Sequence, residues 1–329
     1  MRGARLTFVL IAIGLVAAGL GLVFGETVLN GAQYVQALTA PMSAPAEIIW
    51  AIRAPRVAAA GIVGAALGLA GAVMQGLLRN PLADPGVLGV SAGAGLGAAL
   101  AIAIGAGAAA GGIEVAALTG ALITGLGLTA VAARLRQPES LVLFGAAVSA
   151  FCGALTAMVF NLSPSPVTTA EILSWLMGSV ANRSWSDISH AVPAMLAGLA
   201  LCLWSARGLV MLTLGEETAA LSGLPMSQLR VSAVAGAALL TGASVAMAGV
   251  IGFVGLAAPH LVRSWVGSDP AKALVPSALA GSVILILADL AARVIPTEQE
   301  LKLGVMTALV GAPVFAVVAW RAARHWRHA

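Results

Sequence analysis

The sequence predicts an all-α polytopic membrane protein with about ten transmembrane helices. Hydrophobic residues make up 60% of the 329 residues and charged residues only 9%, whereas a soluble globular domain is about 25% charged. The mean hydropathy is +1.00, and the apolar residues gather into runs of about 20, the length at which a helix crosses a bilayer. These runs leave no room for a soluble domain, so we expect a single transmembrane domain over residues 1–329.

The first apolar run, residues 6–24, follows Arg2 and Arg5 in the manner of a signal peptide. It is longer than the usual apolar core of about 7–15 residues, and no small-x-small cleavage site follows it, so we expect a retained span. Nine further apolar runs predict spans at 56–78, 86–105, 113–133, 141–160, 188–206, 228–248, 250–266, 273–292 and 303–321.

The distribution of basic residues predicts the orientation. An even number of spans puts both termini on one side, and a cytoplasmic N-terminus leaves twelve of the 17 Lys and Arg residues inside and five outside. This excess obeys the positive-inside rule. The net charge of +4 therefore reports topology and gives no reason to expect nucleic-acid binding. The five outer cations are Arg53, Arg56, Arg183, Arg293 and Lys302.

Three segments between the spans have features of their own. Residues 26–51 form a long outer loop, and residues 171–178 are too short to cross the membrane, which predicts a re-entrant or interfacial helix. The polar stretch 214–225, on the cytoplasmic side, predicts a short helix with Glu216 and Glu217 in its first turn, ended by a glycine and then a proline. Its pattern fits equally an ordinary capped connector and a segment gripped by something outside the membrane.

Much of the glycine is patterned. Gly61, Gly64, Gly68 and Gly71 share one face of the second span, and such small residues let helices approach closely in lipid. We therefore expect close packing here rather than ligand binding. The short match between residues 64–67 and 236–239 lies in oppositely directed spans, as an inverted repeat requires, but in a chain this rich in Ala and Gly it is little better than a chance match.

The polar inventory excludes several function classes. Among the 13 carboxylates only Asp289 lies well inside a span, and Arg293 four residues later predicts an ion pair on the helix face. An ion-coupled secondary transporter keeps ionisable groups near the midplane, and an enzyme needs a catalytic motif that is not found here. No P-loop, HExxH or GxSxG occurs, and Cys152 and Cys202 have no paired spacing. We expect a transport path driven from elsewhere, with no catalytic residues, cofactor or metal site.

Several motifs resemble those of the FecCD-type (type II) permeases of bacterial ABC importers, which carry iron chelates, haem or cobalamin. Together they run from about residue 53 to residue 315, almost the whole chain. Lys302 departs from the proline that is usual before the last motif. The matching segments are Arg53-Ala-Pro-Arg56, residues 75–91, residues 215–225, residues 249–263 and residues 304–315.

The resemblance implies a homodimer with an inverted-repeat helix arrangement and a path at the dimer interface. Two copies of a separate ABC ATPase would hydrolyse ATP, a periplasmic binding protein would deliver the metal chelate, and the complex would lie in the bacterial inner membrane with both termini cytoplasmic. The segment 214–225 would be the coupling helix gripped by the ATPase. Its residues in this role would be Gly215, Glu216, Glu217, Ala219, Leu221 and Gly223.

The resemblance also assigns roles to other residues. Arg53, Arg56 and Arg293 would form an outer basic rim that meets carboxylates of the binding protein. Leu82 and the stretch Pro138, Glu139 and Ser140 would occupy the cytoplasmic gate.

The substrate is a separate question, because haem, ferric siderophores and cobalamin all remain open. Arg183 stands near the mouth of an otherwise apolar path, and a lone guanidinium would suit the propionates of haem, although it would also suit lipid headgroups. We therefore expect haem slightly ahead of the other two. An ion-coupled secondary transporter is the alternative from a different class.

Overall fold

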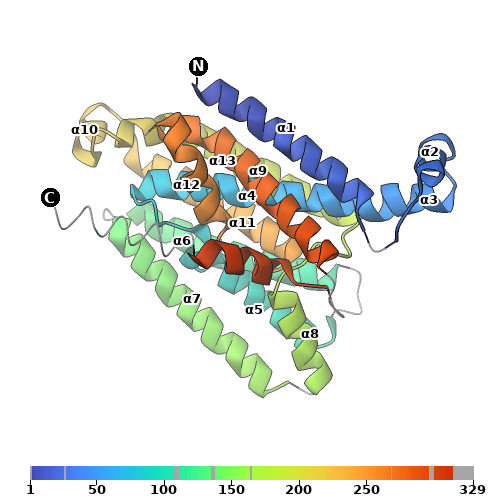
Figure 1. The fold of residues 1–329 in the computed structure, drawn as a ribbon. Helices are drawn as coiled ribbons and strands as arrows, with labels where there is room; N and C mark the ends of the chain where they lie inside the picture. The colour runs from blue at the N-terminus through green and yellow to red at the C-terminus, as the bar shows by residue number, and fades with distance from the viewer. Residues whose placement is uncertain are drawn as a thin grey trace.

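The computed structural model describes residues 2–25, 27–106, 111–134, 138–163, 165–267, 269–295 and 300–313, and the described residues hold helices and connecting loops without a strand. Seven helical stretches are long and apolar enough to cross a membrane. The labelled helices of Figure 1 are α1 (Arg2–Val23), α2 (Gly31–Thr39), α3 (Ala44–Glu47), α4 (Ala54–Leu78), α5 (Val90–Ala103), α6 (Gly112–Arg134), α7 (Pro138–Asn161), α8 (Pro166–Leu176), α9 (Trp185–Leu212), α10 (Glu216–Leu221), α11 (Met226–Ala248), α12 (Val254–Val266) and α13 (Pro270–Val294).

Three of the ten predicted spans are shorter helices. The predicted span 86–105 begins with one 3-10 turn, Pro85–Leu88, and Gly89 at φ 88° separates that turn from α5. The predicted span 250–266 starts late, because α12 begins only after Phe253, whose φ is 67°. The last helix is described over Leu303–Pro313, and the rest of the predicted span 303–321 lies outside the described residues.

The short helix predicted at 171–178 is longer and starts earlier than expected. Helix α8 runs from Pro166 to Leu176 because Ser165 caps it, accepting a hydrogen bond from Thr168 N, and Pro166 stands in the first turn. Proline suits that position since its missing N–H would have no partner there. Figure 1 shows α8 together with α2 and α3 toward one end of the bundle and α10 at the other.

Helix α4 lies at the centre of the bundle and packs directly on α13 and α12. A methyl group added at Gly64 would overlap the carbonyl oxygen of Gly281, and one at Gly71 would overlap that of Gly255. The glycine face of the second span is therefore a close helix-packing surface, as predicted. Helix α11 is similarly buried and packs on α6 and α9.

We call the end of the bundle that carries α2, α3 and α8 the outer end, after the orientation predicted from the sequence. It carries the loop between α1 and α4. Asn30 caps α2 through a reciprocal pair of bonds with Gln33, and Tyr34 Oη donates to the carbonyl of Val23 at 2.8 Å. Trp50 Nε1 donates to Ala37 O at 3.3 Å, and the carbonyl of Trp50 accepts from Trp185 Nε1 at 3.0 Å. These bonds hold the outer loop against the start of α9.

Candidate functional site

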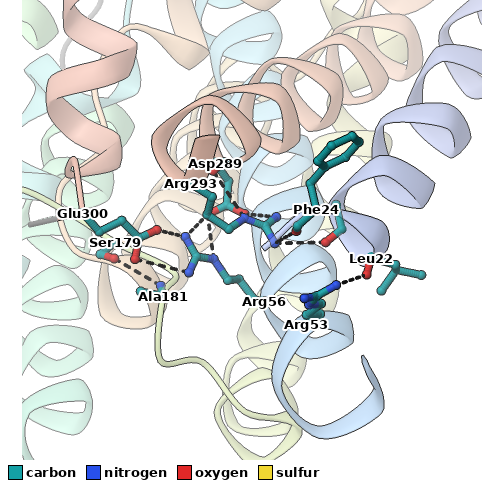
Figure 2. Close-up of polar contacts among 10 residues, drawn as sticks. Leu22, Phe24, Arg53, Arg56, Ser179, Ala181, Asp289, Arg293 and Glu300 are labelled. Carbon is teal, nitrogen blue, oxygen red and sulfur yellow. Dashed lines mark hydrogen bonds and ion pairs between the residues drawn. The ribbon is translucent and has the colours of Figure 1, made fainter. Parts of the chain in front are cut away.

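Four side chains at the outer end form a largely buried group that we call the outer ion cluster: Arg56, Asp289, Arg293 and Glu300 (Figure 2). Arg56 Nη2 lies 2.8 Å from Asp289 Oδ1 and also pairs with Glu300. Arg293 Nη2 lies 2.6 Å from Asp289 Oδ2. The two arginines and two carboxylates balance in charge, which is what allows them to be buried together.

The outer ion cluster joins four parts of the chain. Arg56 comes from the start of α4, Asp289 and Arg293 come from the end of α13, and Glu300 stands just before the last described helix. Arg293 also donates to Gly21 O at 2.9 Å and Phe24 O at 3.3 Å, at the end of α1. The predicted helix-face pair of Asp289 and Arg293 is present, and it is one edge of a larger network.

Arg53 does not belong to the outer ion cluster and bonds backbone carbonyls instead. Its guanidinium donates to Leu22 O at 2.8 Å and Val23 O at 2.7 Å, and it also bonds Thr27 O. Leu22 O and Val23 O belong to the last turn of α1 and have no partners within the helix, and Thr27 O belongs to the loop that follows. Arg53 therefore acts as a C-terminal cap and is 4% exposed.

The structure places the three arginines of the predicted basic rim as follows. Arg53, Arg56 and Arg293 do lie at the same outer end, but their side chains turn inward onto backbone carbonyls and carboxylates. Arg56 is 11% exposed and Arg293 4%. Each cation already has partners because an unpaired charge is expensive to bury. A docking role for them stays a prediction.

Arg183 is not the lone guanidinium that the sequence indicated. Its Nη1 lies 2.8 Å from Glu114 Oε1, a residue 69 positions earlier at the start of α6. The pair is partly exposed, at 17% for Arg183 and 32% for Glu114. A cation already neutralised by a carboxylate has less to offer a carboxylate of a substrate.

A large, mostly apolar cavity lies between α5, α7, α8 and α12. Its volume is about 780 Å³. Leu82, one of the predicted gate residues, lines it, together with the loop that follows α4. Of the other gate residues, Ser140 lies in the first turn of α7, and the side chains of Pro138 and Glu139 lie outside the described set. The polar residues of the lining are Asp84, Ser91, Ser149, Thr156 and Thr241.

Two of these polar residues, Asp84 and Thr241, differ from the rest of the lining in their burial and hydrogen bonding. Asp84 Oδ1 accepts a hydrogen bond from Gly86 N at 2.6 Å, and burial raises the pKa of this carboxyl. Thr241 is 1% exposed, and its hydroxyl has no hydrogen-bond partner among the residues that the structure describes. A buried hydroxyl without a partner can bond a ligand that enters the cavity. The described lining of this cavity contains a carboxylic acid and hydroxyls but no Lys or Arg.

Helix α10 stands at the opposite end of the bundle from α2 and α3, as Figure 1 shows. Gly215 and Gly223 flank it with φ values of 100° and 84°, which only glycine adopts readily. Glu216 pairs with Arg230 of α11 at 2.9 Å, and Ala219 is fully buried. Glu217 and Leu221 face outward, and Leu221 is 90% exposed. Of the residues predicted for coupling, Glu217 and Leu221 therefore lie on the exposed face of α10, whereas Ala219 does not.

Sequence reasoning missed Glu114, Glu300, Asp84 and Thr241. The two glutamates pair with arginines far away in the chain, so no local spacing indicates them. Asp84 stands in the motif of residues 75–91, in which only Leu82 was assigned a role. Thr241 looks like any small helix residue, and only the cavity distinguishes it.

Comparisons with known proteins agree with this architecture. The sequence model of the FecCD transport family matches residues 10–321. An ABC transporter permease protein of Bacillus subtilis, YvrB, is 39% identical over 287 residues, which cover 85% of this chain and 81% of that protein. The cobalamin import system permease protein BtuC of Halobacterium salinarum is 38% identical over 88% of this chain and 80% of its own length.

Two further similarities extend over nearly the full chain. The vitamin B12 import system permease protein BtuC of Vibrio cholerae is 37% identical over 317 residues, 95% of this chain and 93% of that protein. The solved structure of a metal-chelate type ABC transporter in an inward-facing conformation matches with a TM-score of 0.86 at 29% identity. It covers 97% of this chain and 99% of its own.

Proposed function

This chain belongs to the FecCD transport family of ABC importer permeases, and from that premise we propose that it carries cobalamin or a closely related corrinoid into the cytoplasm. The cavity between α5, α7, α8 and α12 is the proposed path for the substrate. As a permease the chain is a transport subunit, and ATP hydrolysis belongs to a separate ATPase.

We choose the substrate from the chemistry of the residues that line the cavity. Its described lining offers Asp84, the unpartnered hydroxyl of Thr241 and other hydroxyls on an apolar surface, with no cation. Cobalamin in its cyano form has no net charge, because the positive cobalt centre balances its single phosphodiester. Its periphery is rich in amides, which both donate to and accept from such groups. Haem carries two propionates, which a cavity without Lys or Arg does not neutralise. The relatives from Halobacterium salinarum and Vibrio cholerae are named as cobalamin and vitamin B12 import permeases, which supports the same choice.

This choice replaces the slight preference for haem that the sequence suggested. That preference depended on an unpaired Arg183, and Arg183 is bound to Glu114. We therefore do not propose Arg183 as a substrate residue. Ferric siderophores and haem remain as competitors to be measured against cobalamin.

The proposed assembly contains two copies of this chain, two ATPase subunits and one periplasmic binding protein in a bacterial inner membrane, with both termini cytoplasmic. A second copy would close the open side of the cavity. The ATPase would grip the outward face of α10, around Glu217 and Leu221, while Gly215, Gly223, Glu216 and Ala219 shape and anchor that helix. The binding protein would meet the outer end near Arg56, and Leu82 and residues 138–140 would gate the path.

Transport by the reconstituted complex tests the proposal. Proteoliposomes that contain the permease, its ATPase and its binding protein should take up cobalamin in an ATP-dependent manner, and excess haem or ferric siderophore should not compete. Asp84→Asn and Thr241→Val should each lower cobalamin uptake at unchanged binding-protein association. ATP-driven uptake of haem or a siderophore without uptake of cobalamin would overturn the substrate assignment.

A further inference from the structure

A second cavity, separate from the proposed substrate path, lies at the end of the bundle that carries α10. Its volume is about 300 Å³. It is formed where α4, α9 and α12 end and α13 begins. Its charged lining residues are Arg79, Arg263 and Asp269.

The carboxylate in this cavity is already neutralised. Asp269 Oδ2 lies 2.8 Å from Lys272 Nζ, and this hydrogen bond and charge lower the pKa of Asp269 below its ordinary value. Asp269 Oδ1 also accepts hydrogen bonds from Ala271 N and Lys272 N, at the start of α13. The cavity therefore keeps the uncompensated charge of two arginines.

Arg79 and Arg263 are both exposed, and neither guanidinium group makes a hydrogen bond or ion pair with a residue in the described part of the chain. Arg79 ends α4 with φ 48°, and Arg263 lies in the last turn of α12. Their charges complement the negative ends of these two helices. That interaction uses the charge but leaves the N–H donors of both guanidinium groups without acceptors.

The cationic cavity continues along α12 into a mixed surface, lined by His260, Leu261 and Ser264. Leu261 and Trp265 are its exposed apolar side chains. A neighbouring cavity of about 590 Å³ shares Arg263 and Gly267 with it and runs along α12 past Leu261. Leu261 is 53% exposed and Trp265 58%. Exposed tryptophan at the end of an apolar helix is typical of the boundary between hydrocarbon and headgroups.

We propose that Arg79 and Arg263 bind the phosphate of an anionic phospholipid, whose acyl chain lies along Leu261 on α12. Arginine pairs with phosphate through two parallel hydrogen bonds, and basic pockets between transmembrane helices on the cytoplasmic side suit anionic headgroups. The side of the membrane follows from the proposed orientation, in which α10 is cytoplasmic. The exposed apolar side chains of Leu261 and Trp265 favour a lipid as the occupant over an acidic segment of the ATPase. The proposed contact with the ATPase is at α10.

Native mass spectrometry of the full permease measures this binding directly. The protein is placed in phosphatidylcholine nanodiscs with increasing phosphatidylglycerol, and retained lipids are counted for the wild type and for the variant R79Q/R263Q. R207Q is the matched control, because Arg207 lines a different cavity at the same end. If each of the two arginines in the cavity contributes about fivefold in affinity through its contact with the phosphate, the double variant should bind phosphatidylglycerol about 25-fold more weakly.

A second variant and a competition complete the test. R79K/R263K keeps both charges and should retain most of the phosphatidylglycerol, whereas R207Q should match the wild type. Inorganic phosphate at millimolar concentration should not displace the lipid, and full displacement would assign the cavity to free phosphate instead. Equal lipid retention in R79Q/R263Q and R207Q would overturn the proposal. So would loss of ATPase association in R79Q/R263Q at unchanged lipid retention, which would make the cavity an ATPase contact.

Discussion

Asp289 and Arg293 form a buried ion pair across one turn of α13, with Oδ2 and Nη2 2.6 Å apart and side chains only 1% and 4% exposed. The other oxygen of Asp289 binds Arg56 of α4. One carboxylate therefore connects the two helices that pack most closely in the bundle. Because ionised groups within a membrane protein are expensive unless they are paired, we conclude that the outer ion cluster holds the outer ends of α1, α4 and α13 together.

Asp289→Asn should lower the free energy of unfolding by about 3 kcal/mol or more, since it leaves two buried arginines short of a partner. Glu300→Gln should have a smaller effect, about 1 kcal/mol, because Glu300 is 25% exposed and can be replaced by water. Reversible unfolding in mixed micelles measures both values. A loss below about 1 kcal/mol for Asp289→Asn would contradict a structural role for the cluster.

Glu300 also competes for the arginine that the binding protein is proposed to meet. If a carboxylate of the binding protein binds Arg56, Glu300→Gln should raise the association rate several-fold at low salt, and Arg56→Gln should lower it. Arg56→Glu is a poor test because it would put a third carboxylate beside Asp289 and Glu300. Surface plasmon resonance with nanodisc-held permease measures the rates.

Lys302→Gln is the control for that measurement. It removes a nearby outer cation that takes no part in the cluster, so it should change the association rate less than Arg56→Gln. Equal rates for wild type, Arg56→Gln and Glu300→Gln would count against docking at Arg56.

The exposed face of α10 provides a sharper test of coupling than its buried face. Ala219→Trp would place an indole where no side-chain volume is free, because Ala219 is 0% exposed, and would disturb α10 itself. Leu221→Asp changes only an outward side chain and should reduce ATPase association at least tenfold. Met42→Asp, an equally exposed apolar residue at the outer end, is the control. Normal ATPase association and ATP-driven uptake in Leu221→Asp would exclude α10 as the coupling helix.

The features that could be predicted from the sequence are those that depend on local residue patterns. Apolar runs located the long spans, and the placement of Glu216, Glu217 and Gly223 predicted α10 within two residues of its observed end. The helix breaks at Gly89 and Phe253 could not be predicted from such patterns. Their left-handed backbone conformations shorten two helices, and hydropathy does not indicate backbone conformation.

The site was less predictable because its contacts join distant parts of the chain. Arg56 meets Asp289 and Glu300 over separations of 233 and 244 residues. The outer arginines could be identified by motif, but their inward orientation depends on the end of α1 and on Glu300. Likewise the charge of Arg183 is evident from sequence, whereas its partner Glu114 becomes its neighbour only when α6 packs in place.

The glycine contact between α4 and α13 gives a prediction about packing alone. Gly64→Ala would place a methyl group against the backbone carbonyl of Gly281. A backbone atom cannot turn aside as a side chain can, so α4 and α13 would have to move apart. Overpacking of this kind lowers stability by about 1–3 kcal/mol. Gly127→Ala in α6 is the matched control, because nothing lies within 4 Å of its added methyl. Equal melting temperatures for the two variants would contradict close packing at Gly64.

The last prediction separates a structural role for Arg183 from contact with the substrate. Arg183 and Glu114 form a partly exposed pair at 2.8 Å, and pairs of this kind contribute about 0.2–1 kcal/mol. Arg183→Ala should therefore destabilise the permease slightly, and the exchange Glu114→Arg with Arg183→Glu should restore most of that loss. Substrate uptake by the exchanged variant, measured in proteoliposomes, should stay within about twofold of wild type, because an ion pair has the same total charge in either direction. If Arg183 instead binds a carboxylate of the substrate, the exchange puts a negative side chain at its position, and uptake should fall at least tenfold while stability recovers.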